Sequence, residues 1–215
     1  MVFCRVARYN FPKKGEFMSK SKQCIMASLI LLTGCASYSA SSLATLSADH
    51  AIESSTHPKV SVSWKKFDKT DCKRYLDRDV ISEGFMPIQI TIRNNSTDPM
   101  YFSPHNFNVP LASVNEVADK AHTNTAGRVV GWGVGGLFIW PLLIPAVYDG
   151  MKSSAANDSL DADYEAKALR EHTIQPQSTF NGVVFVPKKY LSQTLEMSLV
   201  NQKTQEKVVF TEPNF

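Results

Sequence analysis

Apolar and polar residues alternate in several short stretches of this chain. In residues 59–67 every second position from Val60 to Trp64 is apolar, and residues 86–96 repeat the pattern with isoleucine. A period of two is typical of a half-buried β-strand. Shorter patterns of the same kind predict further strands over 98–104, 178–187, 194–201 and 206–212. Short alternating strands separated by turn residues indicate a mainly β protein, and we expect an immunoglobulin-like antiparallel β-sandwich.

Two helical patterns interrupt the alternation. In residues 112–121 the apolar positions have the spacing of one helix face. In residues 153–172 acidic residues come early and basic residues late, as the helix dipole favours, and apolar positions lie four apart at Leu160, Tyr164 and Ala168. We therefore expect a sandwich domain over 58–215 with a helical, partly apolar insertion over about 112–171.

Between the two helical patterns lies an apolar segment, residues 127–149. It contains no charged residue from Val129 to Tyr148. Pro141 and Pro145 each remove a backbone donor and clash with the preceding turn, so we expect a helix to break or kink there. The interpretation that we favour is an apolar helical hairpin with a bend near Pro141.

The hairpin holds the contact residues that the sequence predicts. Gly127, Gly131 and Gly135 are four residues apart, and a glycine face of this kind lets a second helix approach closely. Trp132 and Trp140 have the amphipathic rings preferred at membrane interfaces. Three arrangements stay open: insertion into a membrane or partner, burial inside the fold, and a single transmembrane span. A span would separate strands that look like halves of one sandwich, which counts against it.

Residues 1–34 have the pattern of a bacterial lipoprotein signal peptide. Lys20 and Lys22 precede an apolar run over 25–32, which is too short to span a bilayer, since a span needs about 20 residues. Met18 stands just before these lysines, so we expect translation to start there and leave residues 1–17 out of the fold. An ordinary signal peptide and a short buried helix are the alternatives.

The apolar run ends in Leu32-Thr33-Gly34-Cys35, which resembles the lipobox of bacterial lipoproteins. In that family the cysteine sulfur receives a diacylglycerol, and the signal peptide is cut just before it. The resemblance therefore implies a lipidated Cys35, and two or three acyl chains anchor a protein stably in a membrane. Ala36 stands where inner-membrane members of the family carry Asp. The resemblance thus implies the outer membrane of the bacterial envelope, facing the periplasm.

Cleavage before Cys35 changes the charge of the chain. Six of its 23 basic and one of its 20 acidic residues precede Cys35, which leaves 17 basic and 19 acidic residues and a net charge of −2. A nearly neutral chain gives no reason to expect nucleic-acid binding. Residues 35–57 are rich in Ser, Ala and Thr, which is typical of a flexible tether. A short helix around 47–55 is the one element we expect there.

No pattern in the chain predicts a catalytic, cofactor or metal site. Cleavage before Cys35 removes two of the four cysteines, and with Cys35 lipidated Cys72 is the remaining thiol. We interpret Cys72 as a packing residue or as a partner in a disulfide between chains rather than as a nucleophile. The acidic run over 158–165 lacks the glycine bend of a calcium loop, and the histidines lack zinc spacing. The glycine pattern over 131–136 does not lie in a βαβ unit, so it predicts no dinucleotide cofactor. We interpret the charged stretch 72–84 as a solvated connection, with a recognition loop as the alternative.

Several stretches together, from YLDRDVISEGFMPIQITIRNNS to IQPQSTFNGVVFVP, are similar to a group of uncharacterised lipoproteins of intracellular Gram-negative bacteria. The resemblance spans about residues 60–210 and implies no activity or binding residues. We expect an envelope lipoprotein of structural or interaction type that docks to the membrane, to an envelope protein or to a second copy through 127–149. The alternative is a periplasmic binding module for an apolar ligand or lipid, with the hairpin as a lid, and an enzyme comes third.

Overall fold

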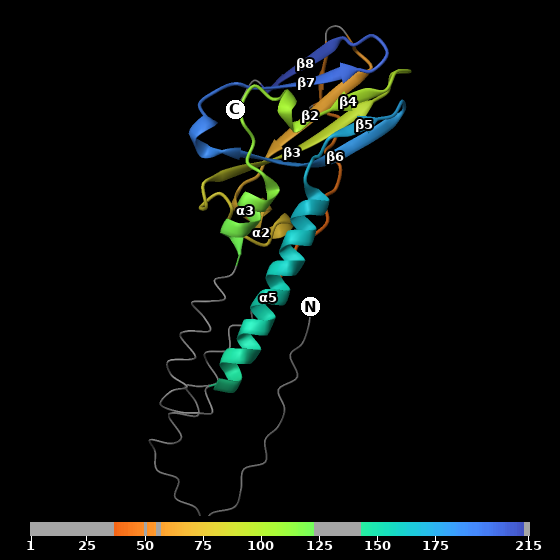
Figure 1. The fold of residues 1–215 in the computed structure, drawn as a ribbon. Coiled ribbons are helices and arrows are strands. Elements are labelled where there is room, and N and C mark those ends of the chain that lie inside the picture. The colour runs from red at the N-terminus through yellow and green to blue at the C-terminus, as the bar shows by residue number, and fades with distance from the viewer. Residues whose placement is uncertain (1–36, 50, 55–56, 123–142, 213–215) are drawn as a thin grey trace, which may run out of the picture. The chain divides into compact units, whose positions relative to one another are not determined.

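In the residues that the structure describes, two antiparallel sheets of four strands each form the centre of the fold (Figure 1). The computed structural model describes residues 37–49, 51–54, 57–122 and 143–212, and residues 143–153 by their backbone alone. The first sheet has the order β1-β2-β3-β6, with β1 (Ile52–Glu53), β2 (Val60–Lys66), β3 (Phe85–Asn94) and β6 (Ser178–Pro187). The second has the order β5-β4-β7-β8, with β5 (His172–Ile174), β4 (Met100–Phe102), β7 (Leu195–Asn201) and β8 (Lys207–Glu212).

The six strands predicted from alternation are confirmed, and the chain is mainly β. β1 and β5 were not predicted, because strands of two and three residues are too short to show a period. The helix expected around 47–55 is wrong. Among the described residues of that range the structure has β1, in which Ile52 pairs with Val62 of β2.

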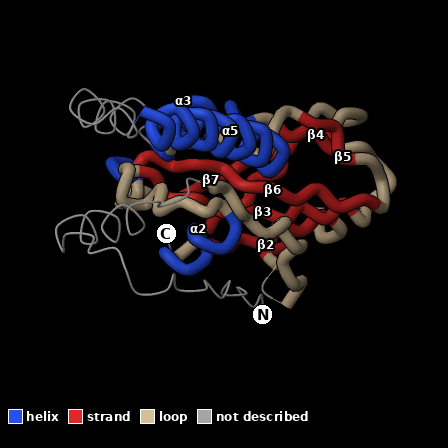
Figure 2. Tube along the Cα trace, turned by 90° about the horizontal axis from the view of Figure 1, so that it is seen from below, coloured by secondary structure: helices blue, strands red, loops and turns tan. Residues whose placement is uncertain are grey.

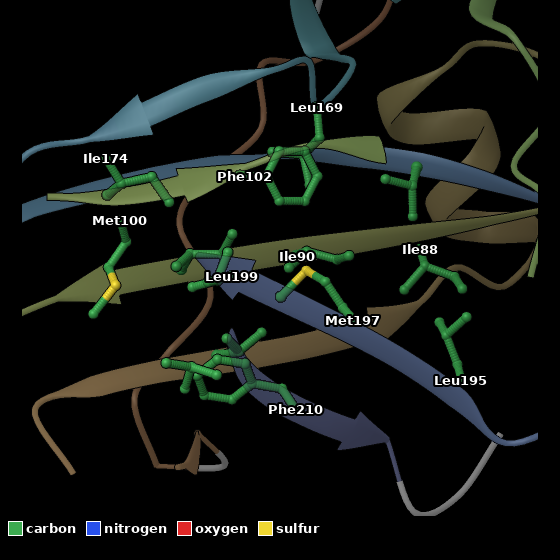
Figure 3. Packing of buried hydrophobic residues seen from close by; sticks show 14 of the residues in the cluster. Ile88, Ile90, Met100, Phe102, Leu169, Ile174, Leu195, Met197, Leu199 and Phe210 are labelled. Carbon is green, nitrogen blue, oxygen red and sulfur yellow. The ribbon is translucent and has the colours of Figure 1, made fainter. Parts of the chain in front are cut away.

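Side chains from both sheets meet in one hydrophobic cluster (Figure 3). Ile88, Ile90 and Ile92 of β3 point into this cluster, and each is at most 1 % exposed. Met197 of β7 and Phe210 of β8 come from the second sheet and are equally buried. The isoleucine period that predicted β3 therefore marks the inner face of the first sheet.

Three helices lie in the described part of the chain, and they pack on the outer face of the first sheet. These are α2 (Lys69–Tyr75), α3 (Val114–Ala121) and α5 (Leu143–Lys167), with two short 3-10 turns, η1 (Pro104–Asn106) and η3 (Lys188–Tyr190). Their apolar residues form a second cluster on Phe85, Val183 and Phe185. α3 and α5 lie side by side, as the view from below shows (Figure 2).

α5 differs from its prediction at both ends. It begins at Leu143 rather than 153 and ends at Lys167, while His172 belongs to β5. Pro145 does not break the helix, because it is the third residue, where a backbone N–H has no partner inside the helix. The acidic run over 158–165 consequently lies in the second half of α5, and the first turn contains no acidic residue.

α2 is a helix in a stretch that we had interpreted as a solvated connection. Asp68 caps it, since its carboxylate accepts a hydrogen bond from the N–H of Asp71 at 2.7 Å. The Asp71 carboxylate accepts in return from the Asp68 N–H, which completes a capping box. The helix buries Cys72 against the second cluster, so the stretch has a packing role.

The segment after Cys35 packs on the domain, so the expectation of a flexible tether over 35–57 is wrong for its described residues. We call residues 37–49 the strap. It forms neither helix nor strand and makes hydrogen bonds to α2, α5 and the first sheet. The strap belongs to the same compact unit as the described residues of the two sheets.

Candidate functional site

The contact residues predicted from sequence lie outside the described residues. This holds for the lipidation site and for the glycine and tryptophan positions of the apolar segment: Cys35, Gly127, Gly131, Trp132, Gly135 and Trp140. The described part of the segment, 143–149, is helical and continuous with the rest of α5. None of the helices that the structure describes combines the length and the apolar composition needed to cross a bilayer.

The second half of α5 holds this helix to the domain. Ala156, Leu160 and Tyr164 are spaced four apart, and each is at most 5 % exposed. The Tyr164 hydroxyl donates to the carbonyl oxygen of Leu76 at 3.1 Å, and its ring stacks on Phe185. Burial raises the pKa of Tyr164 above its ordinary range, so this phenol stays protonated. The predicted apolar face of the helix is thus confirmed at Leu160 and Tyr164.

Tyr38 fixes the beginning of the strap to α5. Its hydroxyl donates to the Asp163 carboxylate, which also accepts from Lys167 one turn later. The Arg78 guanidinium lies 5.7 Å from the centre of the Tyr38 ring. Burial first, and then the hydrogen bond to Asp163, raise the pKa of Tyr38. The contact therefore requires a protonated phenol.

His122 fixes the end of α3 to the same part of α5. Its Nε2 lies 2.6 Å from an Asp161 carboxylate oxygen. Asp161 and Asp163 are about 200° apart around the helix axis and about 3 Å apart along it, given 100° and 1.5 Å per residue. Tyr38 and His122 therefore contact opposite flanks of α5 at one level. In the sequence, Cys35 precedes Tyr38 by three residues, and residues 123–142 follow His122 directly.

Two hydrogen bonds donated by backbone N–H groups of the strap hold it beside α2. The Ser41 N–H donates to the Arg74 carbonyl at 2.8 Å, and the Ser39 N–H donates to the Asp77 carboxylate at 3.3 Å. Asp77 directly follows the cap of α2 and has a left-handed backbone, with φ of 54°. Its side chain is buried and also accepts from Lys73. Asp77 thus joins the end of α2 to the strap.

Further along, the strap crosses the polar part of the outer face of the first sheet. The Leu46 N–H donates to the Thr91 hydroxyl at 3.0 Å, and the Gln89 side-chain amide donates to the Ala44 carbonyl at 2.6 Å. The Arg93 guanidinium donates to the Leu46 carbonyl. Gln89 and Thr91 are at most 3 % exposed. Buried polar groups of the sheet are therefore satisfied by the strap backbone.

A groove lies elsewhere, beside β6. It has a volume of about 840 Å³ and runs between the loop that follows η1 and the connection from α5 to β5. Val109, Leu169 and Phe185 form an apolar floor, and each is at most 5 % exposed. Glu165 and Glu171 lie at the rim, where Glu165 pairs with Arg170 and Glu171 accepts from the Ser103 hydroxyl. The groove thus combines an apolar floor with a charged rim.

The described residues contain little that suggests reaction chemistry. Cys72 is fully buried, and burial followed by the charges of Asp79 and Asp71 raises its pKa to about 12. A thiol of this kind is a packing residue. In the parts of the chain that the structure describes, no three His, Cys, Asp or Glu side chains come together as a metal site.

No protein-family model matches the chain, and neither a curated protein nor a solved structure is significantly similar to it.

Sequence reasoning missed Tyr38, Asp163 and His122 as a set. Tyr38 and its partner Asp163 are 125 positions apart, and no local pattern reports such a contact. One signal was present: Tyr38 is the only Phe, Tyr or Trp between Cys35 and Trp64. A single aromatic residue in a stretch rich in Ser and Ala indicates that the stretch is attached to the domain at that residue rather than being a free tether.

Proposed function

We propose that this chain is a lipid-anchored envelope protein of structural or interaction type. Cys35 carries the acyl anchor, and residues 127–149 dock to the membrane, to an envelope protein or to a second copy. The protein belongs to the bacterial envelope, in the outer membrane and facing the periplasm. The observation that carries the proposal is that Tyr38 and His122 contact α5 at one level.

The two described residues next to the proposed membrane contacts, Tyr38 and His122, support the proposal because both contact the same part of α5. Cys35 precedes Tyr38 by three residues, which is at most about 11 Å of chain. Residues 123–142 begin directly after His122. An acyl anchor on Cys35 would hold the part of the domain around Tyr38 near the membrane surface.

The continuity of α5 supports a rigid connection between segment and domain. Residues 143–149 belong to the same helix as Leu160 and Tyr164, which are buried against the sheet. The part of α5 before Ala156 is about 20 Å long and extends beyond α2 and α3 (Figure 1). Docking through 127–149 would therefore orient the whole domain.

Palmitate labelling in a Gram-negative host tests the anchor. We expect the full chain to incorporate labelled palmitate and the Cys35→Ser variant to lose the label. A wild-type chain without label, or a labelled variant, would contradict lipidation at Cys35. Cys72→Ser serves as the matched control and should keep the label, since Cys72 is buried.

Liposome flotation of residues 36–215 tests the docking segment. We expect the wild type to float with liposomes or to self-associate, and Gly131→Leu/Gly135→Leu to lose both. Ala162→Leu/Ala166→Leu is the matched control, because it adds the same apolar bulk four residues apart on an exposed part of α5. A wild type that neither floats nor self-associates would contradict docking through 127–149.

The groove beside β6 favours a second candidate function, a periplasmic binding module for an apolar ligand or lipid. Its apolar floor and volume of about 840 Å³ fit such a molecule. Native mass spectrometry of the purified protein would then show a bound lipid. Leu111→Trp, which fills the groove, should remove it, and Val209→Trp on the exposed part of the other sheet should not.

We also propose that the two sheets form an immunoglobulin-like sandwich, with the helical and apolar residues inserted between β4 and β5. The neighbours β2-β3-β6 correspond to strands A-B-E of that fold, and β5-β4-β7-β8 correspond to C′-C-F-G. An experimental structure with another order of strands would contradict this assignment.

A further inference from the structure

The strap covers its part of the sheet without becoming a strand of it. Its hydrogen bonds to the sheet run between strap backbone and sheet side chains: Leu46 N–H to Thr91, and Ala44 carbonyl to Gln89. A backbone ladder is cooperative, because each pair of residues positions the next. The isolated contacts between the strap and the sheet form no such ladder, and each contributes little to stability.

The surface beneath the strap is hydrophilic. Facing it are Ser63 of β2, Gln89 and Thr91 of β3, and Asn181 of β6, which the pairing places side by side. The Gln89 amide and the Thr91 hydroxyl both donate to the Asn181 side-chain oxygen, at 3.0 and 2.7 Å. These groups stay bonded to one another when the strap leaves, and water replaces the strap at their other bonds. The residues uncovered on this part of the sheet are therefore polar.

The strap itself is little buried. Of the described residues 37–49 none is buried, and four are half-buried: Tyr38, Ala40, Leu43 and Leu46. Tyr38 and Leu43 touch the edge of the second cluster. Beyond the strap, β1 pairs with β2 in the sheet, so Ile52 and Glu53 are the first residues held by a backbone ladder.

We propose that the strap is a releasable part of the tether: it undocks from the folded domain as a unit, back to β1, while the rest of the fold stays intact. Released, its 13 residues add up to about 45 Å of chain, at roughly 3.5 Å per extended residue. The undocking itself needs no lipid. Its consequence, a domain that moves from the membrane surface to a longer reach, rests on the proposed lipidation of Cys35.

Hydrogen exchange of the full chain, purified in detergent, tests the undocking. The probes are the Ser41 and Leu46 amides in the strap, and the Ile90 amide in β3 is the reference. We expect the strap amides to be protected at least about tenfold relative to an unfolded peptide, yet to exchange at least about 100-fold faster than Ile90. Low urea should leave the strap rates unchanged, since local opening exposes little surface. Strap amides that exchange at the Ile90 rate, or without any protection, would overturn the proposal.

A variant pair sharpens the test. Thr91→Val removes the acceptor of the Leu46 N–H and keeps the shape of the side chain, so Leu46 exchange should accelerate about two- to tenfold while Ile90 is unchanged. Thr173→Val is the matched control, because Thr173 accepts from Gln202 in the other sheet, and it should leave Leu46 unaffected. Equal effects of the two variants on Leu46 would overturn the proposal.

The two proposals fail separately. The hydrogen-exchange rates of the strap amides can be measured whether or not Cys35 is acylated. A missing palmitate label would therefore contradict the lipid anchor without contradicting the release of the strap. Equal exchange rates of the strap amides and the Ile90 amide in β3 would contradict the release of the strap without contradicting the lipid anchor.

Discussion

The outer face of the first sheet has two halves that are covered in different ways. The helix-covered half consists of Phe85, Val183 and Phe185, and α2, α3 and α5 pack on it. The strap-covered half consists of Ser63, Gln89, Thr91, Arg93 and Asn181. The pairing of Gln89 with Val183 marks the boundary between the halves.

The two halves require different kinds of cover. Exposing the apolar half costs about 25 cal/mol for each Å² returned to water, so the helices have to stay. Exposing the polar half exchanges hydrogen bonds with the strap for hydrogen bonds with water, at a net cost of about 0.5–1.5 kcal/mol each. One face of one sheet therefore combines a permanent cover with a removable one.

The largest expected effect comes from the helix-covered half. Leu160→Ala empties a fully buried position on α5, and we expect it to lower the free energy of unfolding by about 2–5 kcal/mol. Leu46→Ala, in the strap, should cost less than about 1 kcal/mol, because Leu46 is only half-buried. Urea unfolding followed by circular dichroism measures both. Equal costs would remove the distinction between the two covers.

The next effect tests how closely α5 approaches the sheet. A Cβ on Gly182 of β6 would lie 2.7 Å from the Lys167 carbonyl oxygen at the end of α5. Because backbone has to move to relieve this contact, we expect Gly182→Ala to destabilise by about 1–3 kcal/mol. Thr179→Ala at an exposed position of the same strand should stay within about 0.5 kcal/mol. Thermal unfolding in which Gly182→Ala matches Thr179→Ala would contradict the close approach.

A smaller, local effect is expected at high pH in the strap. Folding raises the pKa of Tyr38, so its contribution is complete below the unfolded value of about 10 and is lost as the pH rises above it. Subtilisin should therefore cut the wild-type strap faster at pH 11 than at pH 8, relative to a peptide substrate. Tyr38→Phe lacks the ionising group, so its cleavage should be faster at pH 8 and change less with pH. A wild type without this dependence would contradict the Tyr38 contact.

The smallest effect is expected at a site in neither half. Asp98 accepts hydrogen bonds from Lys203 and Asn201, which lower its pKa in the folded protein. Its contribution is therefore present above the unfolded value of about 3.9 and is lost as the pH falls below it. The stability difference between wild type and Asp98→Asn should shrink between pH 6 and pH 3. A constant difference would mean that the charge on Asp98 plays no part.

Sequence patterns predicted the strands well because alternation is a local property. Each inward isoleucine of β3 is two positions from the next, and this spacing is visible without knowledge of the partner strand. The helices were harder to predict. The start of α5 was hidden by Pro145, and α2 was hidden by its charges although Asp68 and Asp71 have the spacing of a capping box.

The strap could not be predicted, because its composition and its contacts point in opposite directions. Ser, Ala and Thr are typical of a tether, and the bonds that hold Leu46 and Tyr38 reach Thr91 and Asp163, which are 45 and 125 positions away. A pattern read over about 10 to 20 neighbouring residues contains only one residue of each of these hydrogen-bonded pairs, so it cannot predict the contact.

Alternation along the chain was enough to predict which residues of β2, β3 and β6 face the core, since the period of a strand sends every second side chain to one face. It left undecided what covers the other face. Gln89 and Val183 are neighbours there, and only the tertiary structure decided that helices cover one side of this pair and the strap the other. The physical reason is that a buried polar residue needs a hydrogen-bond partner, and only the folded path of the chain determines which distant segment provides it.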